Sequence, residues 1–242
     1  MRIRCTTLPV FILGMALLVP LATPATAQEN AQVQALRETP LVRPQQLNMQ
    51  FHRAKTAFDS GASLLEAKAR VDIVLAELPD DTEARKLRAS ILLALEKPEA
   101  AFRDAQRATT LSPGDGEAHV LLCESGVGSG HAALAKESLD TATDLILGDV
   151  ALYIRLSSCA LELGQIRPAE ALARLAMASG ERDGRGHLQL ARVFMRTDRA
   201  GNAETVLVQG LQERAVRAWD IRRDPVLAPL MEREGLAAWR RR

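Results

Sequence analysis

The sequence predicts an all-α solenoid built from helix pairs, and three observations lead to this fold class. Alanine recurs every 34 residues through most of the chain, at Ala67, Ala101, Ala135, Ala169 and Ala203. A period of this length is typical of a repeated helix-turn-helix unit. The apolar content comes mainly from alanine, leucine and valine, and aromatic residues make up only 3%. Both features favour closely packed helices over a β-sandwich.

Residues 1–27 have the features of a secretory signal peptide. Arg2 and Arg4 precede an apolar run from Val10 to Val19, and Ala25-Thr26-Ala27 forms a small-x-small cleavage motif. The alternative is a retained membrane anchor, but the apolar run is well short of the ~20 residues that span a bilayer. We therefore expect cleavage after Ala27 and a mature protein that is periplasmic or secreted, with no direct membrane insertion.

Residues 28–47 are predicted to form a linker. They contain Pro40 and Pro44 and show little hydrophobic periodicity. Such a segment gains little from packing, so we interpret it as one that orders on binding.

Five frames of 34 residues follow, at 48–81, 82–115, 116–149, 150–183 and 184–217. Frame position 4 is mostly bulky, position 8 is mostly small, position 20 is always alanine, and Pro79 and Pro113 end the first two frames. This pattern resembles the tetratricopeptide repeat (TPR) family. The resemblance implies a right-handed superhelical solenoid of about five helix pairs that binds other proteins. Arg85 at position 4 and Gly126 at position 11 depart from the family pattern.

The spacing within each frame has a physical explanation. Positions 4, 8 and 11 recur at intervals of three and four residues, so they share the face of the first helix that packs on the second. At position 20 a side chain larger than alanine would push the helices apart, at a cost of ~1 to 3 kcal/mol. Turn residues such as Ser60-Gly61 and Pro113-Gly114-Asp115 stand between the predicted helices.

Residues 218–242 are predicted to form a C-terminal capping helix, because a stack of helix pairs needs a terminal cover. Apolar residues recur there at Val226, Leu227, Leu230, Met231 and Leu236. We interpret Trp219 and Trp239 as packing residues, and the alternative is that they anchor a ligand.

No residue constellation indicates an enzyme, so we expect no catalytic residues, no metal and no cofactor. The four histidines lack metal-ligand spacing, and His119 and His187 occupy packing position 4. The glycine-rich run at 126–130 is not followed by the Lys-Ser/Thr of a phosphate-binding loop, and we interpret it as a frayed helix end. Cys123 and Cys159 fall on adjacent helices whose axes lie ~8 to 10 Å apart, and we expect two free, buried thiols.

In the resembled family the first helix of each pair lines a concave groove, with positions 2, 5, 9 and 12 facing the partner. These positions carry an apolar stripe, acidic residues towards the N-terminal end and arginines towards the C-terminal end, and such stripes typically bind a partner. The alternative is that neighbouring helices cover the stripe. The expected partner-binding residues are Lys86, Leu93, Glu117, Val120, Glu124, Val127, Ile154, Arg155, Leu161, Arg185, Leu188, Arg192 and Met195.

The sequence therefore predicts a non-enzymatic scaffold or adaptor of the bacterial cell envelope that holds a peptide or helix of another envelope or secreted protein. The alternative function is an accessory or regulatory subunit of an envelope enzyme or of a polysaccharide or protein export machine. The formal net charge changes from +1 to −1 when Arg2 and Arg4 are removed. A nearly neutral protein has no overall attraction for nucleic acid, so no nucleic-acid partner is expected.

Overall fold

The computed structural model describes residues 44–180 and 183–239, and this part of the chain is a solenoid of five α-helix pairs. The predicted signal peptide lies outside the described residues. None of the described helices is long and apolar enough to cross a membrane. The pairs are α2 (Pro44–Asp59) with α3 (Leu64–Glu77), α4 (Thr82–Ala94) with α5 (Pro98–Leu111), α6 (Gly116–Gly128) with α7 (Ala132–Leu145), α8 (Val150–Glu162) with α9 (Ile166–Ser179), and α10 (Arg185–Arg196) with α11 (Ala200–Gln212).

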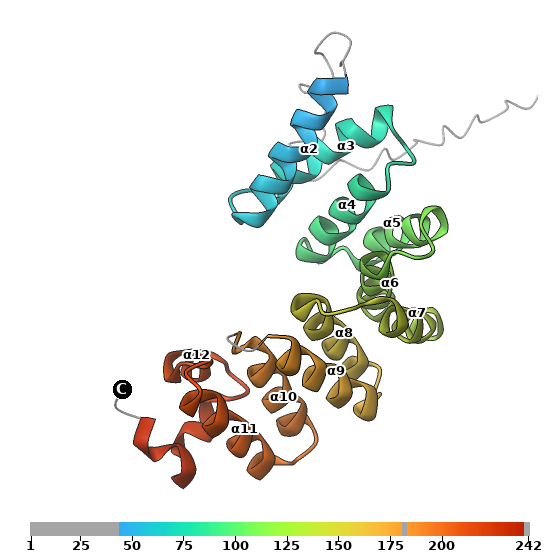
Figure 1. Cartoon of the computed structure of the whole chain (residues 1–242). Helices are drawn as coiled ribbons and strands as arrows, with labels where there is room; N and C mark the ends of the chain where they lie inside the picture. Colours follow the sequence, from blue (N-terminus) through green and yellow to red (C-terminus); the bar gives the residue numbers. More distant parts are fainter. Residues whose placement is uncertain (1–43, 181–182, 240–242) are drawn as a thin grey trace, which may run out of the picture.

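The pairs stack in sequence order into a curved array (Figure 1). The first helices of successive pairs contact one another, α2 with α4, α4 with α6, α6 with α8 and α8 with α10. In Figure 1 the helices α4, α8 and α10 lie on the inner side of the curve, and α5, α7, α9 and α11 lie on the outer side. We call the first helix of each pair an inner helix and the second an outer helix. The predicted all-α repeat solenoid is therefore confirmed.

Aspartates at equivalent repeat positions begin three of the inner helices. Asp81, Asp115 and Asp149 are the N-caps of α4, α6 and α8. Their side chains accept hydrogen bonds from the amides of Ala84 at 2.8 Å, Ala118 at 3.2 Å and Leu152 at 3.0 Å. An N-cap of this kind stabilises a helix by typically ~1 kcal/mol. The repeated aspartate therefore stabilises the start of each of these three helices.

The alanines at position 20 form the tight crossings within the pairs, and all five are completely buried. At the third crossing, a Cβ atom on Gly126 would lie 3.0 Å from the Cβ of Ala135. The departure of Gly126 from the family pattern thus has a packing reason. The run at 126–130 does contain the end of α6, at Gly128, but this end is packed and not frayed, because Gly126 is buried in the crossing.

Helix α2 begins inside the predicted linker. Its first residue is Pro44, and proline is favoured at the first helical position because its missing N–H would be unpaired there anyway. Leu47 is buried against the first pair. The predicted boundary at residue 47 is therefore too late by one helical turn, and residues 28–43 lie outside the described residues.

The C-terminal cover differs from the predicted single helix. It consists of α12 (Ala218–Arg223) and the two 3₁₀ helices η1 (Ala228–Glu232) and η2 (Glu234–Trp239). Pro225 and Pro229 interrupt a continuous α-helix, because proline lacks the N–H group that the helix needs. Four of the five predicted apolar residues nevertheless close the core, with Leu227, Leu230, Met231 and Leu236 buried, whereas Val226 is 39% exposed.

The two tryptophans of this cover behave differently. Trp239 is partly buried and packs against the core, as expected. Trp219 is 51% exposed, and the guanidinium of Arg223 lies 4.9 Å from its ring centroid. The interpretation of Trp219 as a packing residue is therefore wrong.

Cys123 of α6 and Cys159 of α8 form a disulfide, and the expectation of two free thiols is wrong. Their Cα atoms are 6.3 Å apart, within the range that a disulfide spans. The error lies in using the distance between helix axes. Because the Cα atoms lie on a cylinder of radius ~2.3 Å, two that face each other are about 4 to 5 Å closer than the axes are.

The junction between the third and fourth pairs is packed more sparsely than its neighbours. Helix α7 makes far fewer contacts with α8 than α5 makes with α6 or α9 makes with α10. Leu147, in the loop between α7 and α8, is 89% exposed. At this junction the main connection is therefore between the inner helices α6 and α8, which the disulfide joins.

Candidate functional site: the inner face of the solenoid

The inner face carries a partly exposed apolar stripe. Its residues are half-buried and pack against the core beneath them, which leaves part of each side chain accessible: Leu93, Val127, Ile154, Leu188 and Met195. All five belong to the predicted groove, and they lie on α4, α6, α8 and α10. The structure thus leaves at least one partly exposed apolar side chain on each of these four helices.

Two of the predicted apolar anchors are core residues. Val120 is completely buried and Leu161 is only 9% exposed. Val120 lies one turn before Cys123, where α6 and α8 are joined by the disulfide, and the neighbouring helix covers it. Neighbouring helices therefore cover these two side chains, as the alternative interpretation of the stripe predicted.

Lys86 is buried in a cluster of carboxylates between α4 and α6. Its Nζ lies 2.8 Å from Glu83, 2.8 Å from Asp115 and 3.0 Å from Glu117. Burial alone would lower the pKa of the lysine, but its hydrogen bonds to Asp115, Glu83 and Glu117 raise it above the ordinary value. Burial would likewise raise the pKa of the Asp115 carboxyl, and the bonds from Lys86 and the backbone amides hold it below its usual range. Lys86 and Glu117 therefore connect adjacent repeats.

The predicted gradient of charge is largely neutralised by ion pairs. Arg155 Nε donates to Glu124 at 2.9 Å, Arg192 Nε donates to Asp224 at 2.6 Å, and Arg185 Nε donates to Asp183 at 2.8 Å. The first pair links α6 to α8, and the second links α10 to the C-terminal cover. Arg155 and Arg192 are thus held by carboxylates of the protein itself. The prediction that the arginines set the polarity of the groove did not include these ion pairs.

A pocket lies at the C-terminal end of the inner face, and two predicted groove residues, Arg185 and Leu188, line it. Its volume is about 400 Å³. The remaining lining comes from the turn before α10 and from the segment after α11: Asp183, Gly184, Arg214, Ala215, Val216, Arg217 and Asp220. We call this the C-terminal pocket, and it combines an apolar wall with several arginines.

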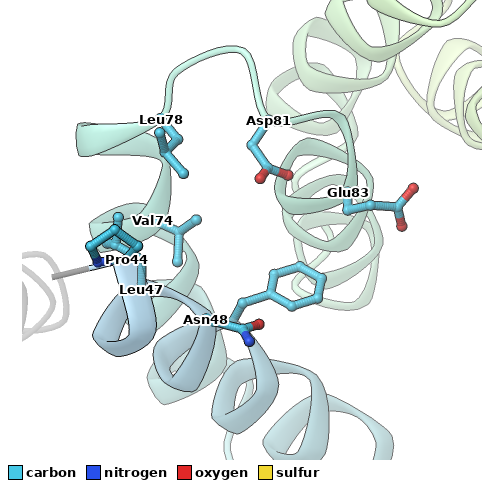
Figure 2. Close-up of a pocket in the computed structure, with 8 residues that line it drawn as sticks. Pro44, Leu47, Asn48, Val74, Leu78, Asp81 and Glu83 are labelled. Atoms are coloured by element: carbon cyan, nitrogen blue, oxygen red, sulfur yellow. The ribbon is translucent and has the colours of Figure 1, made fainter.

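A second pocket lies at the opposite end, between α2, the end of α3 and the start of α4 (Figure 2). It has a volume of about 370 Å³ and is lined by Pro44, Leu47, Asn48, Phe51, Val74, Leu78, Asp81 and Glu83. We call it the N-terminal pocket. The groove prediction missed it because its apolar wall comes partly from α3, which does not belong to the inner helices. Its one local signal is the leucine at the end of α3, Leu78, which is 46% exposed.

The histidines are placed as packing or turn residues. His187 is 3% exposed, and His119 Nε2 lies 3.0 Å from the carbonyl oxygen of Pro113. Ser129 Oγ and a Glu99 oxygen both approach Nδ1 of His131, at 2.9 Å and 4.0 Å. A catalytic triad needs the serine and the carboxylate on opposite ring nitrogens, so this cluster does not form one. Among residues 44–180 and 183–239 no three His, Cys, Asp or Glu side chains are grouped to hold a metal.

Several solved structures share this fold. The chain is similar to TTC0263 of Thermus thermophilus, described as a thermophilic TPR protein, with 20% identity, a TM-score of 0.60, and coverage of 73% of this chain and 95% of that one. It is also similar to MamA of Desulfovibrio magneticus RS-1, with 14% identity, a TM-score of 0.55, and coverage of 72% and 97%.

A further similar structure is YrrB, described as a TPR protein with an unusual peptide-binding site. It shares 15% identity and a TM-score of 0.51, and the match covers 83% of this chain and 97% of that one. The sequence itself matches no protein-family model and no curated protein. The helix pairs, their period and these structural likenesses together identify the chain as a solenoid of the tetratricopeptide-repeat fold.

Proposed function

We propose that the protein is a non-enzymatic scaffold that binds a peptide segment or helix of another protein on its inner face. The observation that carries this proposal is the half-buried apolar stripe of Leu93, Val127, Ile154, Leu188 and Met195. Partly exposed apolar side chains that gather on one face of a solenoid are typical of a protein-binding surface. The lining of the C-terminal pocket combines Arg214 with Leu188, which suits a partner with a carboxylate next to an apolar residue.

We further propose that the scaffold works in the bacterial cell envelope, with an envelope or secreted protein as its partner. The disulfide supports this compartment, because disulfides persist in oxidising environments and are rare in the cytosol. The apolar N-terminal run and the cleavage motif at Ala25-Thr26-Ala27 point the same way.

The groove is tested by replacing Leu188 with glutamate. Burial of such a side chain in a complex is worth ~1.5 to 3 kcal/mol, so Leu188→Glu is expected to weaken binding by at least about tenfold. The measurement is capture of the partner from envelope extracts by the immobilised mature protein, followed by titration of the identified partner.

The matched control is Leu175→Glu. Leu175 is a leucine on the outer helix α9 and is 44% exposed. Both variants are expected to keep the melting temperature of the parent within a few degrees. Unchanged affinity in a folded Leu188→Glu variant would place the binding surface elsewhere.

The compartment is tested by the processing of the chain. If the signal peptide is cleaved after Ala27, N-terminal sequencing of protein recovered from the envelope will begin at Gln28. A membrane-bound product that begins at Met1 would contradict the periplasmic assignment.

A further inference from the structure

The N-terminal pocket lies at the junction of the first and second helix pairs, and the repeat supplies an internal comparison for it. Asp81 and Glu83 stand 34 residues before Asp115 and Glu117, at the start of the preceding inner helix. At the second junction the carboxylates of Asp115 and Glu117 bind Lys86 Nζ, at 2.8 Å and 3.0 Å. The second junction thus shows which group these two positions take up in this fold: the ammonium of a lysine.

At the first junction the equivalent cation is not supplied by the described part of the chain. The residue 34 positions before Lys86 is His52, which is exposed and makes no ion pair with Asp81 or Glu83 there. Asp81 Oδ1 accepts the N-cap bond from Ala84 at 2.8 Å. Its other oxygen, Oδ2, accepts no hydrogen bond from residues 44–180 or 183–239, whereas the same oxygen of Asp115 binds Lys86.

The orientation of the carboxylates distinguishes their roles. Figure 2 shows the Asp81 carboxylate directed into the space beside Leu78 and Val74, and the Glu83 carboxylate directed away from it. Glu83 is already paired with Lys86 at 2.8 Å. Asp81 is therefore the charged group that a ligand in this pocket meets.

Apart from Asn48, the rest of the pocket lining is apolar. Leu47 and Val74 are buried at its base, and Leu78 forms an exposed wall. Helix α2 contacts α4 less than later inner helices contact each other, which leaves the space between them unfilled. The volume of about 370 Å³ lies within the range of ~300 to 1,000 Å³ that is usual for ligand pockets.

We propose that the N-terminal pocket binds a lysine of a partner protein, with an apolar residue next to that lysine in the partner seated against Leu47, Val74 and Leu78. The ammonium takes the place beside Asp81 that Lys86 takes beside Asp115, and the lysine stem packs on the apolar wall. This site is separate from the apolar stripe and from the C-terminal pocket. It gives the solenoid a second point of attachment at its other end.

The test uses the full mature chain and a library of random eight-residue peptides displayed on phage. Selected peptides are expected to share a lysine next to a large apolar residue. The key variant is Asp81→Asn, because asparagine caps a helix as well as aspartate does but carries no charge. A lost charge-assisted hydrogen bond is expected to weaken the peptides by about tenfold. Acetylation of the peptide lysine is expected to have the same effect.

The matched control is Asp149→Asn, which changes the equivalent N-cap of α8 away from the pocket and is expected to leave affinity unchanged. The proposal is overturned if Asp81→Asn binds the selected peptides as well as the parent does. It is also overturned if no lysine-containing peptide is selected, the result expected when residues 28–43 of the chain itself fill the pocket. Peptides lost only in Leu188→Glu would overturn it too, while supporting the proposed function of the inner face.

Discussion

Reduction of the disulfide between Cys123 and Cys159 is expected to lower the free energy of unfolding by about 3 to 4 kcal/mol. The two cysteines are 36 residues apart in sequence, and closing a loop of that length removes chain entropy from the unfolded state by this order. The effect is local as well, because each helix pair contacts only its neighbours. We therefore expect the urea transition of the reduced protein to become broader as well as to shift.

The measurement is urea unfolding of the mature protein with and without reductant, followed by far-UV circular dichroism. The control is the double variant Cys123→Ala/Cys159→Ala, whose transition should not respond to reductant. A thiol titration of the unfolded, unreduced mature protein should find no free thiol, because only these two cysteines remain after cleavage at Ala27. Two free thiols would contradict the disulfide.

Replacing Arg88 with methionine is expected to destabilise the N-terminal half of the solenoid by about 3 kcal/mol. Arg88 donates from Nε to Asp104 Oδ2 at 2.6 Å and from Nη1 to Asp72 Oδ1 at 2.9 Å, so it joins α4 to α5 and α3. The Asp104 side chain is only 5% exposed. Removing one partner of a buried ion pair typically costs ~3 to 5 kcal/mol, because the other charge stays buried. Arg85, 3.0 Å from Asp104, limits the loss to the lower end.

A matched control is Arg107→Met. Arg107 pairs with Asp80 at 2.7 Å, but the two side chains are 44% and 56% exposed. Pairs of this kind contribute ~0 to 1 kcal/mol, so the same substitution should have little effect. The double variant Arg88→Met/Asp104→Leu should recover part of the lost stability, since it leaves no unpaired charge at position 104. If Arg88→Met and Arg107→Met lower the free energy of unfolding equally, the burial of Asp104 does not make the loss of its partner more costly.

The sequence predicts the helix pairs well because their determinants are local. The alanine at position 20 and the aspartate N-caps act within one pair or one turn, and both recur in the printed sequence. The C-terminal cover was less predictable, since Pro225 and Pro229 decide between one helix and several short ones through their effect on backbone hydrogen bonds.

The candidate site was predictable only in part, because exposure depends on the distance between neighbouring inner helices. Val120 and Ile154 occupy the same frame position, yet the first is completely buried and the second is half-buried. No local pattern distinguishes them. The ion pair of Arg155 with Glu124 spans 31 residues, close to one repeat. The period itself could have indicated that pair, whereas the N-terminal pocket depends on how far α2 stands from α4.

The sparse contact between α7 and α8 gives the solenoid an uneven mechanical stiffness. The disulfide fixes the inner edge of that junction, while little packing resists movement at the outer edge. We therefore expect any bending at this junction to occur about the disulfide between Cys123 and Cys159. A ligand bound across α6 and α8 would find the distance between these two helices constant. The distance between the two ends of the curved array would vary. We therefore expect the solenoid to be stiff where α6 and α8 are joined and flexible in the distance between its two ends.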